Sequence, residues 1–161
     1  MGQKRKLTKD TPVAELDKIL GIEPDVVREG DTLLAVAHKI VENPATRVVC
    51  VVDAANKLLG IIPLRHICQH VVYEIAPEEM FHRIARYEDV VAVAHHTVGA
   101  TARDLMDGPV YTKTDDTVKD AIEKMFDAGL EGLPIVDEQL HVVGYIDMLE
   151  LLAAWIQARG G

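Results

Sequence analysis

The sequence predicts an α+β fold in which two copies of one β-α-β-β-α unit pack with pseudo-two-fold symmetry, with a helical insert between them. Three observations support this prediction: a repeat in the short apolar runs, matching helical periodicities in the two halves, and one segment without a counterpart. The chain has 161 residues, of which 48% are hydrophobic, and this is enough to bury a core.

The repeat is clearest in two apolar runs. Residues 50–53, Cys-Val-Val-Asp, match residues 134–137, Pro-Ile-Val-Asp, and a glycine (Gly60 or Gly144) stands seven residues after each aspartate. Two large residues follow each glycine. Short apolar runs separated by turn residues are typical of strands, so each half is expected to contain a pair of them.

Matching helices precede and follow these strands. In each half an Asp-Thr pair, at 31–32 or 116–117, stands where a helix N-cap belongs, because its side-chain oxygens can accept the free N–H groups of the first turn. The apolar positions that follow share the spacing of an amphipathic helix: Leu33, Val36, Ala37, Ile40 and Val41 in the first half, and Val118, Ala121, Ile122, Met125 and Phe126 in the second.

The last helix of each half is repeated in the same way. The two apolar stripes share five offsets: Leu64, Ile67, Cys68, Val71 and Val72, and then Met148, Leu151, Leu152, Trp155 and Ile156. A unit of this size cannot close its own core, so the two copies are expected to pack against each other. The predicted organisation is a tail at 1–12, a first repeat at 13–76, a helical insert at 77–101 and a second repeat at 102–161.

The composition and the N-terminal sequence argue against several classes of protein. The net charge of −9 argues against binding nucleic acid through a basic surface. No apolar run is long enough to cross a membrane, and no secretion signal opens the chain, so a cytoplasmic location is expected. Cys50 and Cys68 are interpreted as small core residues in a reducing compartment. No motif of a catalytic site is present, so we do not expect an enzyme.

With these residues in view, the chain resembles a tandem pair of cystathionine-β-synthase (CBS) domains, a stand-alone Bateman module, over residues 13–75 and 102–157. The resemblance implies a regulatory protein without an obligatory cofactor, which binds AMP, ATP or S-adenosylmethionine in the cleft between its repeats. It also implies a homodimer that forms through the end helices, 64–76 and 147–157.

Family members that bind nucleotides carry a hydroxyl residue three positions after the glycine, for ribose or phosphate, and an acidic residue three positions later, for the ribose hydroxyls. In this chain the position of the hydroxyl residue holds Pro63 in the first repeat and Asp147 in the second. The position of the acidic residue holds His66 in the first repeat and Glu150 in the second. Pro63 suits the first residue of a helix, and Asp147 suits an N-cap. Asp147 would repel a phosphate and attract a sulfonium. Glu150 is either a ribose ligand or a solvated charge on a helix. His66 could donate to a ribose or, when protonated, to a phosphate, although a histidine on an exposed helix face more often does neither.

The family's adenine slot, carried over by position, has apolar walls and available backbone groups. In the second repeat it comprises Val110, Tyr111, Thr112, Leu130, Gly132, Leu133 and Pro134, and in the first repeat Val26, Val27, Thr46, Arg47 and Val48. The same residues would equally suit an ordinary strand edge. Arg47 is the best-placed cation for a phosphate.

Two alternatives to a ligand sensor stay open. In one, the nucleotide motif has decayed and the module is a scaffold that dimerises or docks an unknown protein through residues 77–100. In the other, the protein responds to a metal. His66 and His70 stand one helical turn apart and could chelate zinc or nickel, although solvated histidines are the simpler interpretation of the pair.

Overall fold

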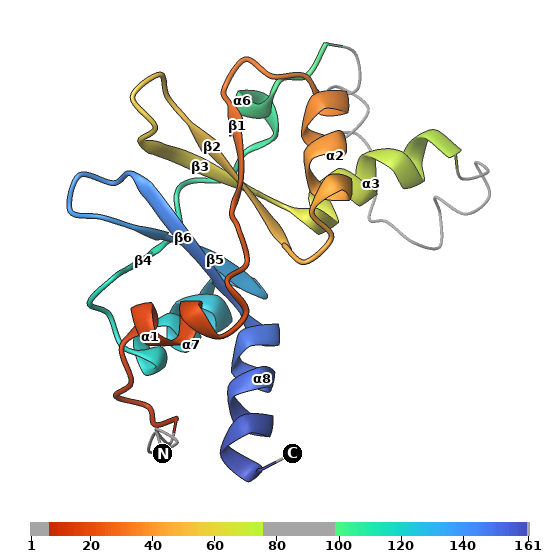
Figure 1. Cartoon of the computed structure of the whole chain (residues 1–161). Helices are drawn as coiled ribbons and strands as arrows, with labels where there is room; N and C mark the ends of the chain where they lie inside the picture. Colours follow the sequence, from red (N-terminus) through yellow and green to blue (C-terminus); the bar gives the residue numbers. More distant parts are fainter. Residues whose placement is uncertain (1–6, 76–98, 161) are drawn as a thin grey trace.

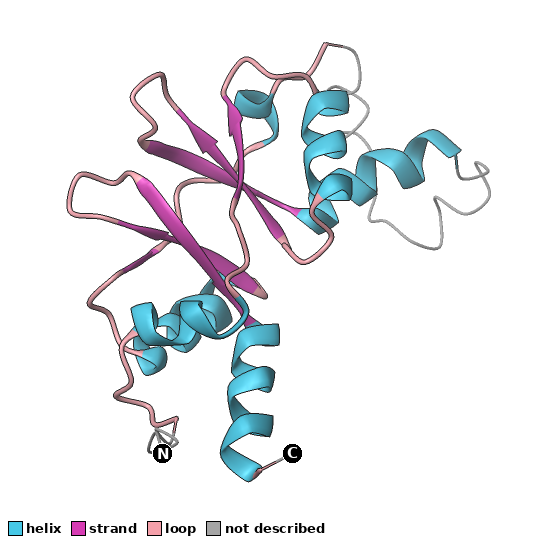
Figure 2. Cartoon of the chain, viewed as in Figure 1, coloured by secondary structure: helices cyan, strands magenta, loops and turns pink. Residues whose placement is uncertain are grey.

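Each half of the chain forms a three-stranded mixed sheet in the computed structural model, which describes residues 7–75 and 99–160. In the first sheet the central strand runs parallel to one neighbour and antiparallel to the other, in the order β1 (Asp25–Arg28), β2 (Val48–Val52) and β3 (Leu58–Pro63). The second sheet has the same order and directions, with β4 (Thr112–Lys113), β5 (Gly132–Val136) and β6 (Val142–Asp147). Figure 2 shows the two sheets. The predicted α+β repeat is therefore confirmed.

The helices between the first and second strands begin at the predicted caps. These are α2 (Leu33–Glu42) and α7 (Val118–Ala128). The hydroxyl of Thr32 accepts from the N–H of Ala35 at 3.2 Å, and the hydroxyl of Thr117 accepts from the N–H of Asp120 at 3.3 Å. The threonine of each Asp-Thr pair thus supplies the cap, because its side chain reaches the free donors of the first turn.

The end helices follow the last strands directly. They are α3 (Leu64–Ile75) and α8 (Met148–Arg159). Pro63 is the last residue of β3, so the prediction that it opens the helix was wrong by one position. Asp147 caps α8 as expected, since its carboxylate accepts from the N–H of Leu149 at 2.7 Å.

The two repeats exchange their leading helices (Figure 1). The helix α1 (Val13–Leu20) is the first element of the first repeat but packs against α7, α8 and β6 of the second. The short helix α6 (Ala102–Leu105) is the first element of the second repeat but packs against α2 and β3 of the first. Backbone hydrogen bonds fix both crossings, for example from the N–H of Val13 to the carbonyl of Asp116 at 2.9 Å. Each repeat therefore needs a segment of the other to close its core.

The buried core reflects this exchange. One hydrophobic cluster joins Val13 and Leu16 of α1, Cys50 of β2 and Leu133 and Ile146 of the second sheet. Burial raises the pKa of the Cys50 thiol to about 12, so Cys50 is the core residue that the sequence predicted. Cys68 is exposed on α3, and its assignment to the core was wrong.

The predicted helical insert, 77–101, lies almost entirely outside the described residues, together with its histidines His82, His95 and His96. In the part of the chain that the structure describes, no helix is both long enough and apolar enough to span a membrane.

Candidate functional site

Two adjoining pockets lie at the boundary between the repeats, where α3 and α8 begin. The α8 pocket encloses about 450 Å³ and is lined by Arg47, Met125, Phe126, Gly129, Leu130, Glu131, Asp147, Met148 and Leu149. The α3 pocket encloses about 300 Å³ and is lined by Arg47, Pro63, Leu64, Arg65, Cys68, Gly129, Leu130 and Glu131. The two share four residues, so a molecule in either pocket contacts both repeats.

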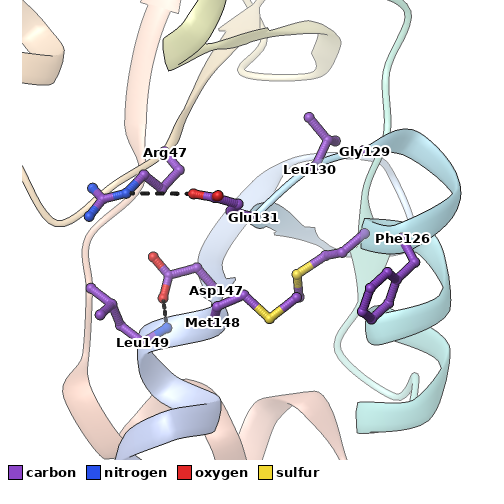
Figure 3. Close-up of a pocket in the computed structure, with 9 residues that line it drawn as sticks. Arg47, Phe126, Gly129, Leu130, Glu131, Asp147, Met148 and Leu149 are labelled. Carbon is purple, nitrogen blue, oxygen red and sulfur yellow. Dashed lines mark hydrogen bonds and ion pairs between the residues drawn. The ribbon is translucent and has the colours of Figure 1, made fainter.

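Arg47 and Glu131 face each other between the two pockets (Figure 3). The Nε of Arg47 lies 4.0 Å from a carboxyl oxygen of Glu131. The guanidinium also donates to the carbonyls of Pro44 and Thr46, at 2.8 and 2.9 Å. The backbone N–H of Arg47 donates to the buried hydroxyl of Tyr145 at 2.9 Å. Arg47 is thus held by both repeats, and its charge is balanced by Glu131.

Asp147 ends β6 and reaches into the α8 pocket. Only 1% of the residue is exposed. One carboxyl oxygen accepts from the N–H of Leu149, and the other makes no well-formed hydrogen bond among the described residues. Burial raises the pKa of Asp147, and hydrogen bonding by the N–H of Leu149 and by the hydroxyl of Tyr145 opposes the rise.

Glu150 lies in the first turn of α8, beneath α1, and is fully buried. Neither of its carboxyl oxygens makes a well-formed hydrogen bond among the described residues. Backbone groups of Asp147 and Ile22 lie near enough to lower its pKa, but other effects outweigh them. Burial, together with the neighbouring Asp17 and Asp147, raises the pKa of Glu150 to about 8. The interpretation of Glu150 as a solvated charge was therefore wrong. Its role as a ribose ligand stays a prediction.

Asp17 is the third acid of this group, and the sequence did not single it out. It comes from α1, and its carboxyl group lies against Gly144 of β6. Burial raises its pKa, while the backbone N–H of Tyr145 opposes the rise. No sequence pattern could place Asp17 beside Glu150, because the two meet only through the crossing of α1 onto the second repeat.

The predicted adenine slot is only partly open. Of the residues assigned to it, Leu130 and Arg47 line the pockets. Several others are buried within the sheets and their core: Val27, Val48, Thr112, Gly132, Leu133 and Pro134. Val110, Tyr111 and Val26 pack partly buried against the same core. Thr46 is buried, and its hydroxyl bonds to the carboxylate of Asp25. None of these lines either pocket, so their contact with a base stays a prediction.

The histidines of α3 lie apart from the pocket linings. His66 is half-buried, with its Nδ1 3.7 Å from a carboxyl oxygen of Asp107, and His70 is buried. Among residues 7–75 and 99–160, no group of three or more histidine, cysteine, aspartate or glutamate side chains could hold a metal ion. His66 lines neither pocket, and its contribution to a ligand site stays a prediction.

Arg65 is a pocket residue that the sequence analysis missed. Its guanidinium donates to the carbonyl of Gly129 at 2.6 Å, and this bond holds it at the α3 pocket. Arg65 and Leu149 occupy equivalent positions of the two repeats and each lines a pocket, but neither belongs to the motif carried over from the family.

Comparison with known sequences gives the family. Residues 7–73 and 102–156 match the model of the CBS domain. The uncharacterized protein MK0525 of Methanopyrus kandleri is 29% identical over 124 residues, which cover 76% of this chain and 53% of the relative. The chain thus spans about half the length of the curated relative it matches.

Comparison with solved structures gives the same family. A CBS domain-containing protein of Thermotoga maritima, tm0935, is 26% identical with a TM-score of 0.73, and the match covers 96% of this chain and 98% of that one. Two more distant structures share the fold. The CBS domain pair of MJ0100, bound to 5′-methylthioadenosine and S-adenosylmethionine, is 20% identical with a TM-score of 0.65 and coverages of 90% and 95%. CBSX2 bound to AMP is 17% identical with a TM-score of 0.65 and coverages of 92% and 98%.

The family match falls on both halves of the chain, and each half forms the same sheet. The repeat, the paired pockets and the structural relatives lead to one assignment. The chain belongs to the CBS domain family and carries two CBS domains in tandem.

Proposed function

We propose that this chain is a cytoplasmic regulatory module that senses an adenosyl ligand between its CBS repeats and transmits binding as a conformational change of a homodimer. The observation that carries the proposal is the pair of pockets lined by residues of both repeats. A ligand there favours the arrangement of the repeats that it binds best, and so shifts the population between two arrangements. The ligands in MJ0100 and CBSX2 support an adenosyl compound.

A thermal-shift series with AMP, ATP and S-adenosylmethionine tests the sensor. A ligand at about a hundred times its Kd stabilises a fold by about 2.7 kcal/mol. For a domain of this size, that corresponds to a rise of about 5–10 °C in Tm. We expect such a rise with at least one of the three compounds. A flat series at millimolar concentrations of all three would contradict the sensor.

Glu150→Gln locates the ribose subsite. Above about pH 8, where Glu150 is ionised, its carboxylate can accept hydrogen bonds from both ribose hydroxyls, whereas an amide has only one accepting oxygen. The variant should therefore reduce the ligand-induced shift. Glu123→Gln is the matched control, because Glu123 is exposed on α7 outside both pockets. Equal shifts in the two variants would remove Glu150 from the ribose site and leave the sensor itself standing.

A second function, a ligand-free scaffold, is favoured by one observation. The two places that the family gives to a hydroxyl hold Pro63 and Asp147, and the acidic place of the second repeat is buried under α1. In a scaffold the adenosyl series would be flat, and deletion of residues 77–100 would abolish partner binding. The same deletion would leave adenosyl binding intact in a sensor.

The proposed homodimer is supported by the end helices. Their apolar stripes stay largely exposed in the single chain, with Leu152 at 54% and Trp155 at 53% on α8, and Val71 at 46% on α3. An apolar face of this kind is typical of a subunit contact. Light scattering should therefore give twice the mass of one chain.

The double variant Leu152→Ser, Trp155→Ser should convert this dimer to a monomer, because both side chains are exposed and their removal costs the fold little. Val143→Ser is the control, since Val143 is equally exposed but lies on β6. A dimer that survives the double variant would exclude this face of α8 as the contact.

A further inference from the structure

The two crossings between the repeats differ in the group that accepts a hydrogen bond from the last strand. Ile61 and Tyr145 are equivalent residues, because each follows the repeated glycine. The N–H of Ile61 donates to the backbone carbonyl of Asp107, just after α6, at 3.2 Å, and the N–H of Asp107 donates back at 2.8 Å. The partner of the Tyr145 N–H is instead the carboxyl group of Asp17 on α1. The α6 crossing is therefore held here by backbone groups, and the α1 crossing by a group that titrates.

A second carboxyl group, that of Glu150, is buried where α1 covers the start of α8 (Figure 1). None of the Glu150 residue is exposed, and neither carboxyl oxygen makes a well-formed hydrogen bond among the described residues. An ionised carboxylate in such a place is more costly than a carboxylic acid, because the charge has lost its water. The packing of α1 on α8 therefore favours the protonated form of Glu150.

The charged groups that face Glu150 add to this preference. Asp17 from α1 and Asp147 from the end of β6 both act on it, and both are acids. The other charged groups that act on these two acids are Glu23, Lys18 and Arg47. Burial and the two acids together raise the pKa of Glu150 to about 8. Loss of its proton at alkaline pH thus places a negative charge beside two other acids, under the helix that holds the crossing.

The equivalent place in the first repeat is built differently. There the position of Glu150 holds His66, whose Nδ1 lies 3.7 Å from a carboxyl oxygen of Asp107. The side chains of His66 and Asp107 are 27% and 51% exposed, so water screens the interaction between them. The α6 crossing therefore depends little on the charges of its side chains, and the α1 crossing depends on them strongly.

Only the C-terminal end of α1 depends on these carboxyl groups. The N-terminal end is held by backbone bonds, from the N–H of Val13 to the carbonyl of Asp116 at 2.9 Å and from the N–H of Val118 to the carbonyl of Thr11 at 2.8 Å. Opening of the other end exposes Leu16, which is buried in the core that α1 shares with the second repeat. The open form is therefore a minority, of the kind that hydrogen exchange measures.

We propose that α1 is a pH-sensitive latch, whose C-terminal end, residues 16–22, is closed over α8 while Glu150 carries a proton and opens when that proton is lost. At alkaline pH the O–H bond of Glu150 breaks, the proton passes to water, and the carboxylate left beside Asp17 favours the open form. The two sheets stay folded during this opening. The inference goes beyond ligand sensing, since it needs no ligand, and it gives one of the two crossings a response to alkaline pH.

Hydrogen–deuterium exchange of the full chain at pH 6 and pH 9, corrected for the intrinsic effect of pH on exchange, tests the latch without any ligand. The protection of residues 16–22 should fall about tenfold between the two pH values, because the closed form keeps a proton that the open form releases. At both pH values the protection of β5 should stay at least about tenfold higher than that of residues 16–22, because β5 exchanges only when the whole fold opens.

Three variants assign the response to its groups. In Glu150→Gln, which has no charge to gain, the protection of residues 16–22 should change by less than about twofold between pH 6 and pH 9. Asp17→Asn keeps an oxygen that accepts from the Tyr145 N–H and removes one of the two neighbouring acids, so the fall should be smaller than in the wild type. Glu123→Gln is the matched control, because Glu123 is exposed on α7, and it should behave as the wild type.

Three results would overturn the latch. The first is a wild type whose protection at residues 16–22 does not fall with pH. The second is an equal fall in the wild type and in Glu150→Gln, which would assign the response to other groups. The third is equal protection of residues 16–22 and β5 at pH 9, which would mean that α1 opens only when the whole chain unfolds. None of these results bears on the adenosyl sensor, because no ligand is present.

Discussion

Replacing Glu150 with glutamine should raise the Tm of the protein at pH 8 by about 4–8 °C and change it little at pH 5. The reason is the burial of a carboxyl group without well-formed hydrogen bonds beneath α1. Its ionised form is disfavoured by the loss of water and by Asp17 and Asp147 nearby. Glutamine has nearly the same shape and carries no charge at any pH.

The direction of this pH dependence of stability follows from how many protons the folded and unfolded chains bind. The pKa of Glu150 is about 8 in the folded protein, compared with 4.5 for an ordinary glutamate. Between these values the folded chain holds a proton that the unfolded chain has released. The contribution of this proton to the free energy of unfolding is therefore fully present below about pH 4.5, and it is lost as the pH rises towards 8. Local opening that admits water reduces the full effect, and we expect a loss of about 2 kcal/mol over this window.

Thermal unfolding of the wild type and Glu150→Gln between pH 5 and pH 8 measures this difference. Glu123→Gln is again the control, because Glu123 is an exposed acid on α7 that pairs with Lys119. Its Tm should follow the wild type at every pH. Parallel curves for wild type and Glu150→Gln would contradict the raised pKa and would mean that α1 does not seal this carboxyl group from water.

The sequence was sufficient to predict the elements that depend on neighbouring residues. The stripes after Thr32 and Thr117, and the apolar runs around Cys50 and Ile135, formed the expected helices and strands. Each depends on a local period or a local cap, and both are visible in one stretch of chain. The duplication doubled these signals, so the paired sheets were predictable from the repeat alone.

The candidate site was less predictable, because it is built by distant segments. The crossing of α1 onto the second repeat buries Glu150, which its position in the first turn of α8 had made ambiguous between ligand and solvated charge. The helix α6 has only four residues, too few to show a period. Cys68 shares a stripe with buried Ile67 but lies on its exposed side, and a stripe does not reveal its width.

The two repeat glycines should differ sharply in what they tolerate, with Gly60→Ala costing about 3 kcal/mol of stability, or about 6–12 °C in Tm. A Cβ atom at Gly60 would lie 2.4 Å from the backbone carbonyl oxygen of Asp107. That carbonyl accepts from the N–H of Ile61 at 3.2 Å, and the N–H of Asp107 donates back at 2.8 Å. The clash therefore falls on paired backbone, which cannot shift without breaking both bonds.

Gly144 is the equivalent residue of the second repeat and provides the comparison. A Cβ atom there would meet only the ends of flexible side chains, the carboxyl of Asp17 at 2.9 Å and a methyl of Ile135 at 3.2 Å. These can rotate away, so Gly144→Ala should cost about 1 kcal/mol. Urea unfolding of both variants measures the two costs, with Gly30→Ala as the control in open space. Equal costs at Gly60 and Gly144 would mean that α6 and its following loop are not held against β3, and that only α1 secures the exchange between repeats.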